Sequence, residues 1–289
     1  MSGPAAGDIA RAVFTAAVED LVRHDALLRL RANEDAVHDA RVAVRRLRSD
    51  VRTFAPVLDP AWIRALRERM RWLQDAFSAP RDADVLLSAL RRQADLLSTD
   101  DRRKAEEALA PLREERERAY ERMHAMLGDA RYAALLQELV DAAKRPPLTA
   151  RAEEPARDVL PQIVEAAWSK LRKRIRRRSR PPADRELHRI RIAAKRVRYA
   201  TEAVAAIGGR RAHVLARAVE KLQTVLGDQH DAVIACARLR ALPKDGDTAF
   251  VAGQLAMLEQ QSAAAGRNAW RAAWREAKRA HRAFRRRLC

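Results

Sequence analysis

One basic pattern occurs twice in this chain, and each copy begins with a histidine. The stretch HDARVAVRRLRSDVR begins at His38 and HRIRIAAKRVRYATE begins at His188, so the two copies are 150 residues apart. Apolar positions repeat too, since Ala43 corresponds to Ala193. The equivalent cations are Arg41 and Arg191, Arg45 and Lys195, Arg46 and Arg196, and Arg48 and Arg198. Repetition of this kind indicates two copies of one structural unit.

A second pair of segments follows the two motifs at nearly the same distance. LQDAFSAPRDA begins at Leu73 and LQTVLGDQHDA begins at Leu222, a shift of 149. The equivalent polar residues are Gln74 and Gln223, and Asp82 and Asp231. Between the copies, KRPPLTARAEEP holds three prolines and predicts a linker. The expected organisation is a first repeat in 1–145, a proline-rich linker in 146–156 and a second repeat in 157–289.

The composition indicates an all-α fold. Alanine and leucine dominate, only nine of the 289 residues are glycine, and β-branched runs bounded by turn residues are hard to find. Residues 33–35 offer a cap for the first motif helix, which is expected to run until Pro56. SAP, ending at Pro80, is expected to break a helix. The other predicted helices span 8–31, 60–77, 82–97, 101–127, 130–144, 158–178, 184–206, 211–226, 231–241, 248–265 and 268–287.

The net charge of +19 is concentrated in one half of the chain. Residues 1–150 hold 26 basic and 25 acidic side chains, whereas residues 151–289 hold 32 basic and 14 acidic ones. Such an asymmetry indicates an anionic partner, either a polymer or a membrane surface. The sequence shows no signal peptide and no apolar stretch long enough to span a membrane. Two cysteines are too few for a disulfide framework, which favours a cytoplasmic location.

Helical periodicity places the motif cations on one face. Taking His38 as the origin, the arginines within roughly 80° of it are Arg41, Arg45, Arg48 and Arg52. In the second copy the face holds His188, Arg191, Lys195 and Arg198, with Arg196 and Tyr199 beside them. Glu202 replaces Arg52, so the second stripe is expected to be shorter.

The two stripes are nearly free of acid. Ordinary solvated helix faces mix signs, as REERERAYER does at 113–122. Like charges one turn apart destabilise a helix by about 0.2–0.5 kcal/mol per pair, and a bound anion would relieve that repulsion. The stripes therefore favour anion binding over a solvated face. The two histidines fit either a phosphate-donating role or a structural one.

The paired H-x-x-R-x-x-x-[RK]-R-x-R blocks, each followed by an L-Q-x8-D-type segment, resemble the CHAD domain, the conserved histidine α-helical domain. The resemblance spans about residues 8–287. It implies two pseudo-symmetric helical bundles around a basic central groove, binding of inorganic polyphosphate, and association with polyphosphate granules. The residues that inherit phosphate contact are His38, Arg41, Arg45, Arg46, Arg48, Arg52, His188, Arg191, Lys195, Arg196, Arg198 and Tyr199.

Two other features leave alternatives open. KLRKRIRRRSR, at 170–180, is typical of a nucleic-acid or acidic-lipid patch, although Trp168, Leu171 and Ile175 fit a core face, and we interpret the run as an extension of the polyanion surface. The adjacent His230 and Asp231 look like a metal pair of phosphohydrolases. Arg81 and Asp82 occupy the equivalent positions, so both aspartates are predicted to cap helices instead.

An enzyme has little support in this sequence. It lacks G-x4-G-K-[ST], H-E-x-x-H and the E-x-E-x-K pattern of triphosphate-tunnel enzymes. We therefore expect no catalytic residues, no metal and no cofactor. A polyphosphate-binding protein is the first hypothesis, a nonspecific nucleic-acid binder the second and a phosphate-processing enzyme the third.

Overall fold

The computed structural model describes residues 3–30, 34–242 and 246–286, and confirms the all-α fold. Within these ranges there is no β-strand, and two isolated bridges pair Ala5 with Pro155 and Leu58 with Leu148. The predicted cap at Asn33 lies outside the described residues. The helices are α1 (Ala6–Leu30), α2 (Glu34–Thr53), α3 (Pro60–Ala94), α4 (Thr99–Ala108), α5 (Ala110–Leu127), α6 (Ala130–Lys144), the 3-10 helix η1 (Ala150–Glu153), α7 (Ala156–Arg176), α8 (Asp184–Ala203), α9 (Ala205–Ala241) and α10 (Gly246–Arg285).

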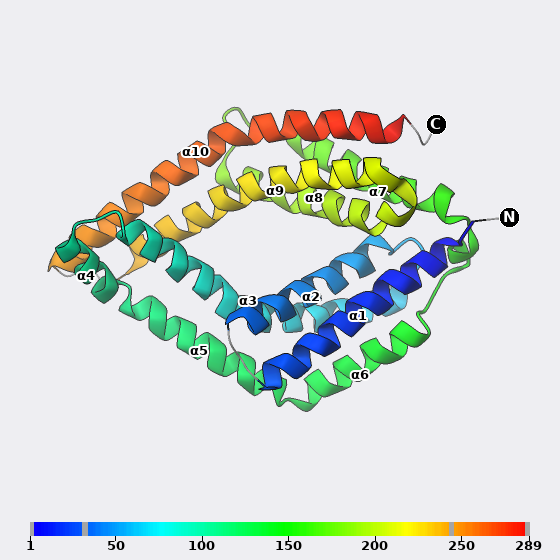
Figure 1. The fold of residues 1–289 in the computed structure, drawn as a ribbon, viewed down its shortest axis with the longest axis horizontal. Helices are drawn as coiled ribbons and strands as arrows, with labels where there is room; N and C mark the ends of the chain where they lie inside the picture. Colours follow the sequence, from blue (N-terminus) through cyan, green and yellow to red (C-terminus); the bar gives the residue numbers. More distant parts are fainter. Residues whose placement is uncertain (1–2, 31–33, 243–245, 287–289) are drawn as a thin grey trace.

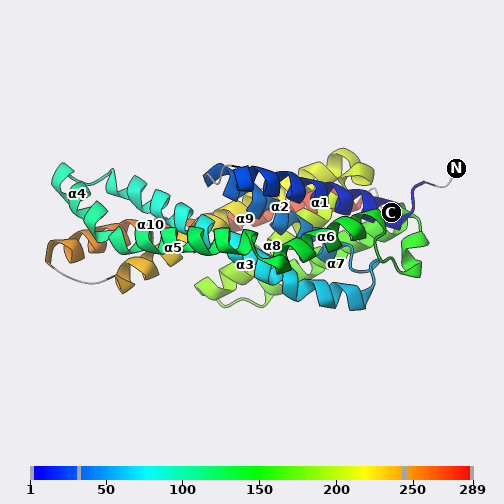
Figure 2. The same ribbon diagram turned by 90° about the horizontal axis from the view of Figure 1, so that it is seen from below.

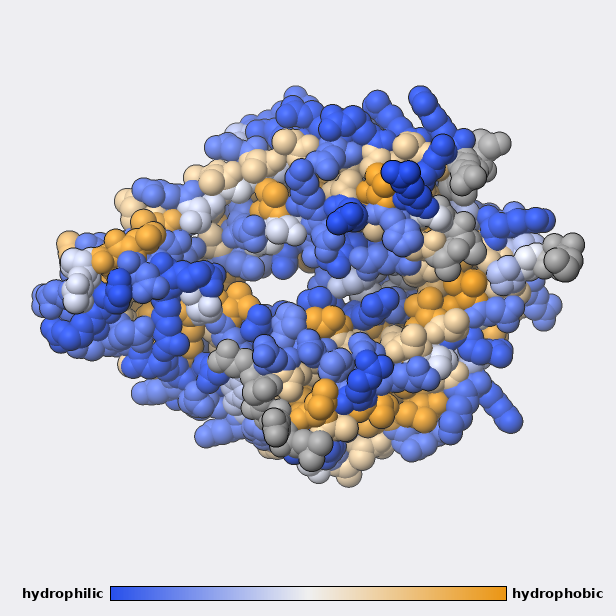
Figure 3. Space-filling model, viewed as in Figure 1, coloured by the Kyte–Doolittle hydropathy of each residue, from blue (hydrophilic) through white to orange (hydrophobic). Residues whose placement is uncertain are grey.

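The helices form two elongated halves that meet at both ends (Figure 1). Helices α1–α6 make one half and α7–α10 the other. At one end α2 packs against α8 and α1 against α7, and at the other α3 and α4 pack against α10. Figure 2 shows that the molecule is flat, with α4 and the beginning of α10 at the same end. Between α3 and α9 an opening passes through the molecule, with hydrophilic residues along most of its rim (Figure 3).

Two hydrophobic cores hold these ends together. The larger joins residues from both halves, including Leu21, Leu47, Leu171 and Val197, which are all fully buried. The smaller lies at the far end and joins the second half of α3 to the end of α9 and the start of α10. Burial on this scale fixes the two halves relative to each other. The polar surfaces between the cores are thereby held in place.

The motif helices α2 and α8 bury equivalent positions. On α2 the buried residues include Val37, Ala40, Ala43, Val44 and Leu47, and on α8 they include Leu187, Ile190, Ala193, Ala194 and Val197. Each residue of the second set lies 150 positions after its counterpart. Both helices consequently turn the same motif face away from the core. This equivalence is what the predicted internal repeat requires.

Several predicted helix breaks are wrong. Pro80 lies inside α3, where it is buried on the same face as Phe77, and burial there offsets the hydrogen bond that proline cannot donate. Helix α9 continues through 227–230, and a kink at Gly209 (φ 56°) replaces the predicted gap near 207–210. Conversely, the single helix expected at 101–127 is divided at Leu109, because Pro111 lies in the first turn of α5.

Gly266 also lies inside a continuous helix rather than at a break. A Cβ atom added to Gly266 would lie 2.6 Å from Cβ of Gln229 and 3.3 Å from its Cα. Helices α9 and α10 therefore approach each other too closely here for any side chain. The glycine at this position serves packing, which the local sequence does not reveal.

We expect Gly266→Ala to destabilise the protein by about 1–3 kcal/mol, because the added methyl group pushes α9 and α10 apart. The measurement is the free energy of unfolding in urea. Gly253→Ala, on the same helix, is the matched control because its Cβ would meet nothing within 4 Å. There, alanine should be neutral or stabilising by up to about 1 kcal/mol. Equal stabilities for the two variants would contradict the close-approach interpretation.

The segment predicted as a linker is docked onto the first half. Backbone N–H groups of Asp59 and Thr149 donate to Pro147 and Val57 over 2.8 Å and 3.0 Å. Farther along, Ala6 donates to Glu154 over 2.9 Å. These bonds hold the connection against the N-terminal end of α1 and the turn between α2 and α3.

Candidate functional site

The two motif faces lie against one another. Helices α2 and α8 are in contact, and Nε of Arg45 on α2 donates a hydrogen bond to Oη of Tyr199 on α8 over 2.9 Å. Tyr199 is 7 % exposed, so its hydroxyl is fixed inside this contact. Residues 154 positions apart in sequence thus meet at the centre of the site.

A cavity of about 540 Å³ opens beside this contact. Helix α7 adds Lys170 to its lining, and α3 adds Gln74. Neither residue was among the predicted site residues. Lys170 comes from the basic run at 170–180, and Gln74 from the repeated L-Q segment. Six predicted residues line the same cavity, namely Arg45, Arg48, Arg52, Lys195, Arg196 and Tyr199.

Lys195 lies at the electrostatic centre of this cavity. Burial, followed by the charges of the surrounding arginines, lowers the pKa of Lys195 from its ordinary value of 10.5 to about 7. The arginines are Arg45, Arg191, Arg41 and Arg48, which come from both motif copies. The folded protein therefore holds Lys195 close to cations of both motif copies, and their repulsion disfavours its charged form.

Arginines of α3 extend the cation cluster toward the end of α2. Burial and then the charges of Arg196, Arg48 and Arg67 lower the pKa of Arg52 to about 10. The pKa of Arg48 is also lowered, mainly by burial, and Arg71 and Arg67 contribute to the decrease. The sequence analysis did not predict Arg67 and Arg71 as site residues because they lie outside the repeated motif. Their spacing of four residues places them on one helix face.

Arg41 and Arg191 also lie near Lys195, and each has an aspartate side chain close to it. Nη2 of Arg41 is 2.6 Å from Oδ1 of Asp82, and the guanidinium of Arg191 influences the pKa of Asp231. Burial raises the pKa of Asp231. The predicted capping role of both aspartates is wrong, because Asp82 and Asp231 lie inside α3 and α9 rather than before a helix. They face the motif arginines instead.

The two motif histidines occupy equivalent, partly buried positions. Burial is the main cause that lowers the pKa of both histidines. The charge of Arg81 lowers the pKa of His38 further, and the charge of Arg191 does the same for His188. In the described part of the chain, Nδ1 of each histidine is buried and has no hydrogen-bond partner. The ring of His188 also lies 4.0 Å from that of His230. Both histidines therefore lie beside motif-face arginines, where their lowered pKa favours the neutral ring.

The other six predicted residues do not line the cavity, and two of them, Arg46 and Arg198, point away from it for reasons that the structure shows. Arg198 is paired with Glu202 (2.7 Å) and Glu220 (3.1 Å). Its counterpart in the first copy, Arg48, donates to Gln74 instead. The difference follows from Glu202, which stands where the first copy has Arg52 and pairs with Arg198. Arg46 is exposed on the side of α2 that carries Asp50. The cationic face of α8 therefore ends near Arg196.

The adjacent His230 and Asp231 lie near Arg191, and among the residues that the structure describes they form no metal cluster with other side chains. Across the described ranges, no group of three or more His, Cys, Asp or Glu residues is placed to hold a metal ion. Burial, with His188 and Arg191, lowers the pKa of His230 to about 4. The pair is thus part of the surroundings of Arg191.

These features define a class of all-α proteins in which two elongated helical halves bring histidine-headed basic faces together. This chain belongs to the CHAD family, because the model of the CHAD domain matches residues 12–240. None of its described helices is long and apolar enough to cross a membrane.

Solved structures share the fold over nearly the whole chain. The CHAD domain from the plant Ricinus communis is 25% identical, with a TM-score of 0.71, and the match covers 94% of this chain and 92% of that one. PptA from Streptomyces chartreusis is 22% identical, with a TM-score of 0.77 and coverage of 94% and 99%. The latter likeness concerns the fold alone.

Curated relatives are longer than this chain. The uncharacterized proteins Rv2226 and MT2285, from two strains of Mycobacterium tuberculosis, are each 29% identical over 244 residues. Each match covers 80% of this chain and 45% of the relative, so the chain spans about half the length of these proteins.

Proposed function

We propose that this chain binds inorganic polyphosphate in the cavity between α2 and α8 and associates with polyphosphate granules in the cytoplasm. The observation that carries the proposal is the position of Lys195 among four arginines of the two motif copies. A phosphate chain entering the cavity would replace repulsion between cations with charge-assisted hydrogen bonds. The cation cluster is thus preorganised for a dense linear anion.

The lining of the cavity favours polyphosphate over nucleic acid. Nonspecific binders of single strands combine basic grooves with aromatic side chains on which bases stack. Among the described lining residues Tyr199 is the one aromatic residue, and it is buried with its hydroxyl bonded to Arg45. The cavity therefore offers phosphates many contacts and bases none. Nucleic acid remains the second candidate because the charge alone attracts it.

An enzyme is the third candidate and has the least support. The described residues that line the cavity include no carboxylate, histidine or cysteine. Phosphoryl transfer relies on divalent metal ions held by such carboxylates. Incubating polyphosphate with the protein, with and without Mg²⁺, and following chain length over time tests this point. Shortening of the chain would overturn the proposal of a pure binding protein.

Polyphosphate affinity should fall steeply with salt. If the six cavity cations, Arg45, Arg48, Arg52, Lys170, Lys195 and Arg196, each contact one phosphate, the slope of log affinity against log salt is about −4, taking roughly −0.7 per contact as for single-stranded nucleic acid. Fluorescence anisotropy with labelled polyphosphate at several salt concentrations measures it. A flat response would contradict the cavity as the binding site.

Competition separates the first two candidates. Unlabelled polyphosphate should displace the labelled chain far more effectively than duplex DNA at equal phosphate concentration. Equal displacement would favour a general nucleic-acid binder. A fluorescent fusion should also gather at granules in cells that contain polyphosphate and spread out in cells that lack it.

A further inference from the structure

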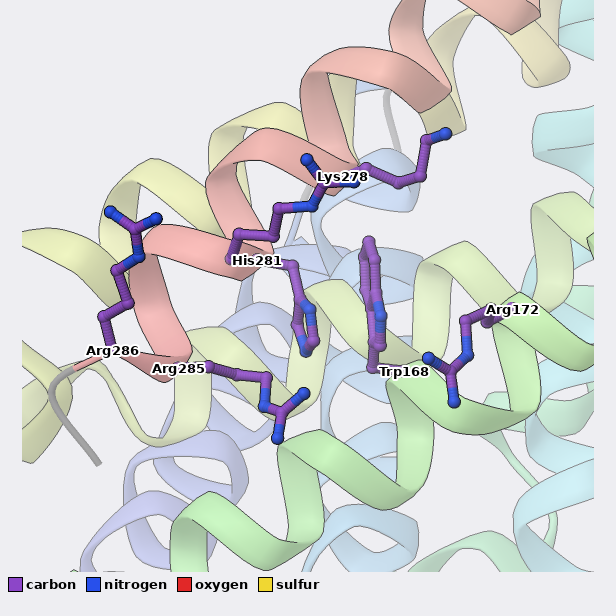
Figure 4. A pocket seen from close by; sticks show the side chains of 7 residues that line it. Trp168, Arg172, Lys278, His281, Arg285 and Arg286 are labelled. Carbon is purple, nitrogen blue, oxygen red and sulfur yellow. The ribbon is translucent and has the colours of Figure 1, made fainter. Parts of the chain in front are cut away.

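A second basic cavity lies on the outside of the molecule, between α7 and the C-terminal end of α10. Its volume is about 520 Å³. Figure 4 shows Trp168 and His281 side by side between the two helices, with cationic side chains around them. The surrounding cations are Arg172, Lys278, Arg282, Arg285 and Arg286. None of these belongs to the repeated motif.

The floor of this outer cavity is rigid. The ring of Trp168 lies 4.0 Å from that of His281 and 5.0 Å from that of Trp274. Nε2 of His281, which is 5 % exposed, is 2.7 Å from Oε1 of Glu165. Trp168 is itself 4 % exposed, which confirms its predicted place in the core. The cations thus project from a fixed aromatic base.

Among the described residues, most of these cations have no acidic partner. Arg285 lies 3.8 Å from Glu165, but in the described chain the other four have no carboxylate within 4.0 Å. Arginines of α5 behave differently, since Arg113 pairs with Glu106 and Arg118 with Glu114. A rigid surface of unpaired cations is suited to an anionic ligand.

A series of basic hollows follows α7 between this outer cavity and the cavity between α2 and α8. Neighbouring hollows share lining residues, so each lies beside the next. In order from the inner cavity to the outer one, the shared residues are Lys170, then Lys173 and Arg177, then Arg172. Beyond the outer cavity, Arg282 and Arg286 also line one further basic hollow. We call this surface the outer basic track.

We propose that the outer basic track binds the continuation of the same polyphosphate chain that enters the inner cavity, so that one long chain passes around α7 and occupies both. This inference rests on the proposed polyphosphate-binding function. A helix with its side chains is about 10–12 Å across, a distance that a flexible anion can follow. Duplex DNA stays stiff over about 50 nm and cannot turn around a single helix.

Occupying both sites makes affinity depend on chain length. Once one part of a long chain is bound in the inner cavity, the rest is held near the track at a high effective concentration. A chain shorter than the ~10–12 Å width of α7 can fill only one site at a time. Long polyphosphate should therefore bind more tightly than short polyphosphate, and the difference should depend on the track.

The test compares short and long polyphosphate on purified full-length variants. Arg172→Glu/Arg282→Glu reverses one exposed cation on each side of the outer cavity. Arg118→Glu/Arg122→Glu makes the same change in charge on exposed positions of α5, away from the track. We expect the track variant to lose about tenfold in affinity for long polyphosphate relative to the α5 variant and to bind short polyphosphate within about threefold. Circular dichroism checks folding.

Each other outcome decides a separate point. Equal long-chain affinities for the track and α5 variants would overturn the proposal, as would equal losses for short and long chains. If Lys195→Glu binds both lengths like wild type while the track variant fails, the inner cavity is wrong as the polyphosphate site and the track binds alone. If duplex DNA binding falls with the track variant as strongly as long-chain binding, the track serves nucleic acid instead.

Discussion

Arg45→Glu and Lys195→Glu should each weaken polyphosphate binding by about tenfold to a hundredfold. Each charge-assisted contact contributes about 1.5–3 kcal/mol, and every 1.4 kcal/mol corresponds to a factor of ten. The two residues come from opposite motif copies but line one cavity. On the proposed function a single phosphate chain in that cavity would contact both, so either reversal would remove a contact and add repulsion. Calorimetric titration of long-chain polyphosphate measures the loss.

The control for these reversals is an exposed cation outside both basic surfaces. Arg113 is a poor choice because it is half-buried and its Nη1 bonds to both the backbone oxygen and the carboxylate of Glu106, whereas Arg122 is exposed on the same helix and lies away from the cavity. Arg122→Glu should change affinity little. If Arg45→Glu binds like wild type while Lys195→Glu does not bind, the ligand sits only on the C-terminal half. The paired faces would then be wrong as a single site.

The coarse architecture was accessible from the sequence because it depends on periodicity. The apolar positions of the two motif helices recur every three to four residues, and the same positions are buried in α2 and α8. Helix ends were less accessible. Pro80 and Gly266 are ordinary signals of a break, yet burial of Pro80 and the contact of Gly266 with Gln229 keep both helices continuous. Such tertiary contacts leave no local mark in the chain.

The site was predicted in part for a similar reason. The repeated spacing includes six of the residues that line the cavity, because helical periodicity places them on the contacting faces of α2 and α8. It did not reveal which cations are neutralised. Arg198 is lost to Glu202 and Glu220, and Arg41 is paired with Asp82 across helices. Nor did it supply Lys170 or Arg67, which belong to helices that have no copy of the motif.

The depressed pKa of Lys195 has consequences for stability. In the unfolded chain its pKa is near 10.5, and in the folded protein it is about 7. Between these values the unfolded state binds more protons, so this residue makes stability rise with pH from about 7 to 10.5. Below pH 7 the folded protein must carry the buried charge. Lys195→Met should therefore stabilise the free protein, most strongly below pH 7 and least near pH 10.

Polyphosphate affinity should fall as pH rises above 7. Bound phosphate favours the charged ammonium and raises the pKa of Lys195, so binding above pH 7 takes up a proton and weakens by up to about tenfold per pH unit. His38 and His188, whose pKa values are lowered, stay neutral in this range. Asp50, whose pKa burial raises to about 7, gains negative charge there and acts in the same direction.

Lys195→Arg separates the contributions of Lys195 and Asp50, because a guanidinium keeps its charge throughout. This variant should bind at pH 6.5 and keep most of its affinity at pH 9, whereas wild type loses about tenfold or more over the same interval. Calorimetry at pH 8 in two buffers with different ionisation enthalpies should also show proton uptake by wild type and little by the variant. If the arginine variant keeps the full pH dependence and Asp50→Asn abolishes it, the titrating group is Asp50. Lys195 would then be charged at neutral pH, and burial and the neighbouring arginines would lower its pKa less than to about 7.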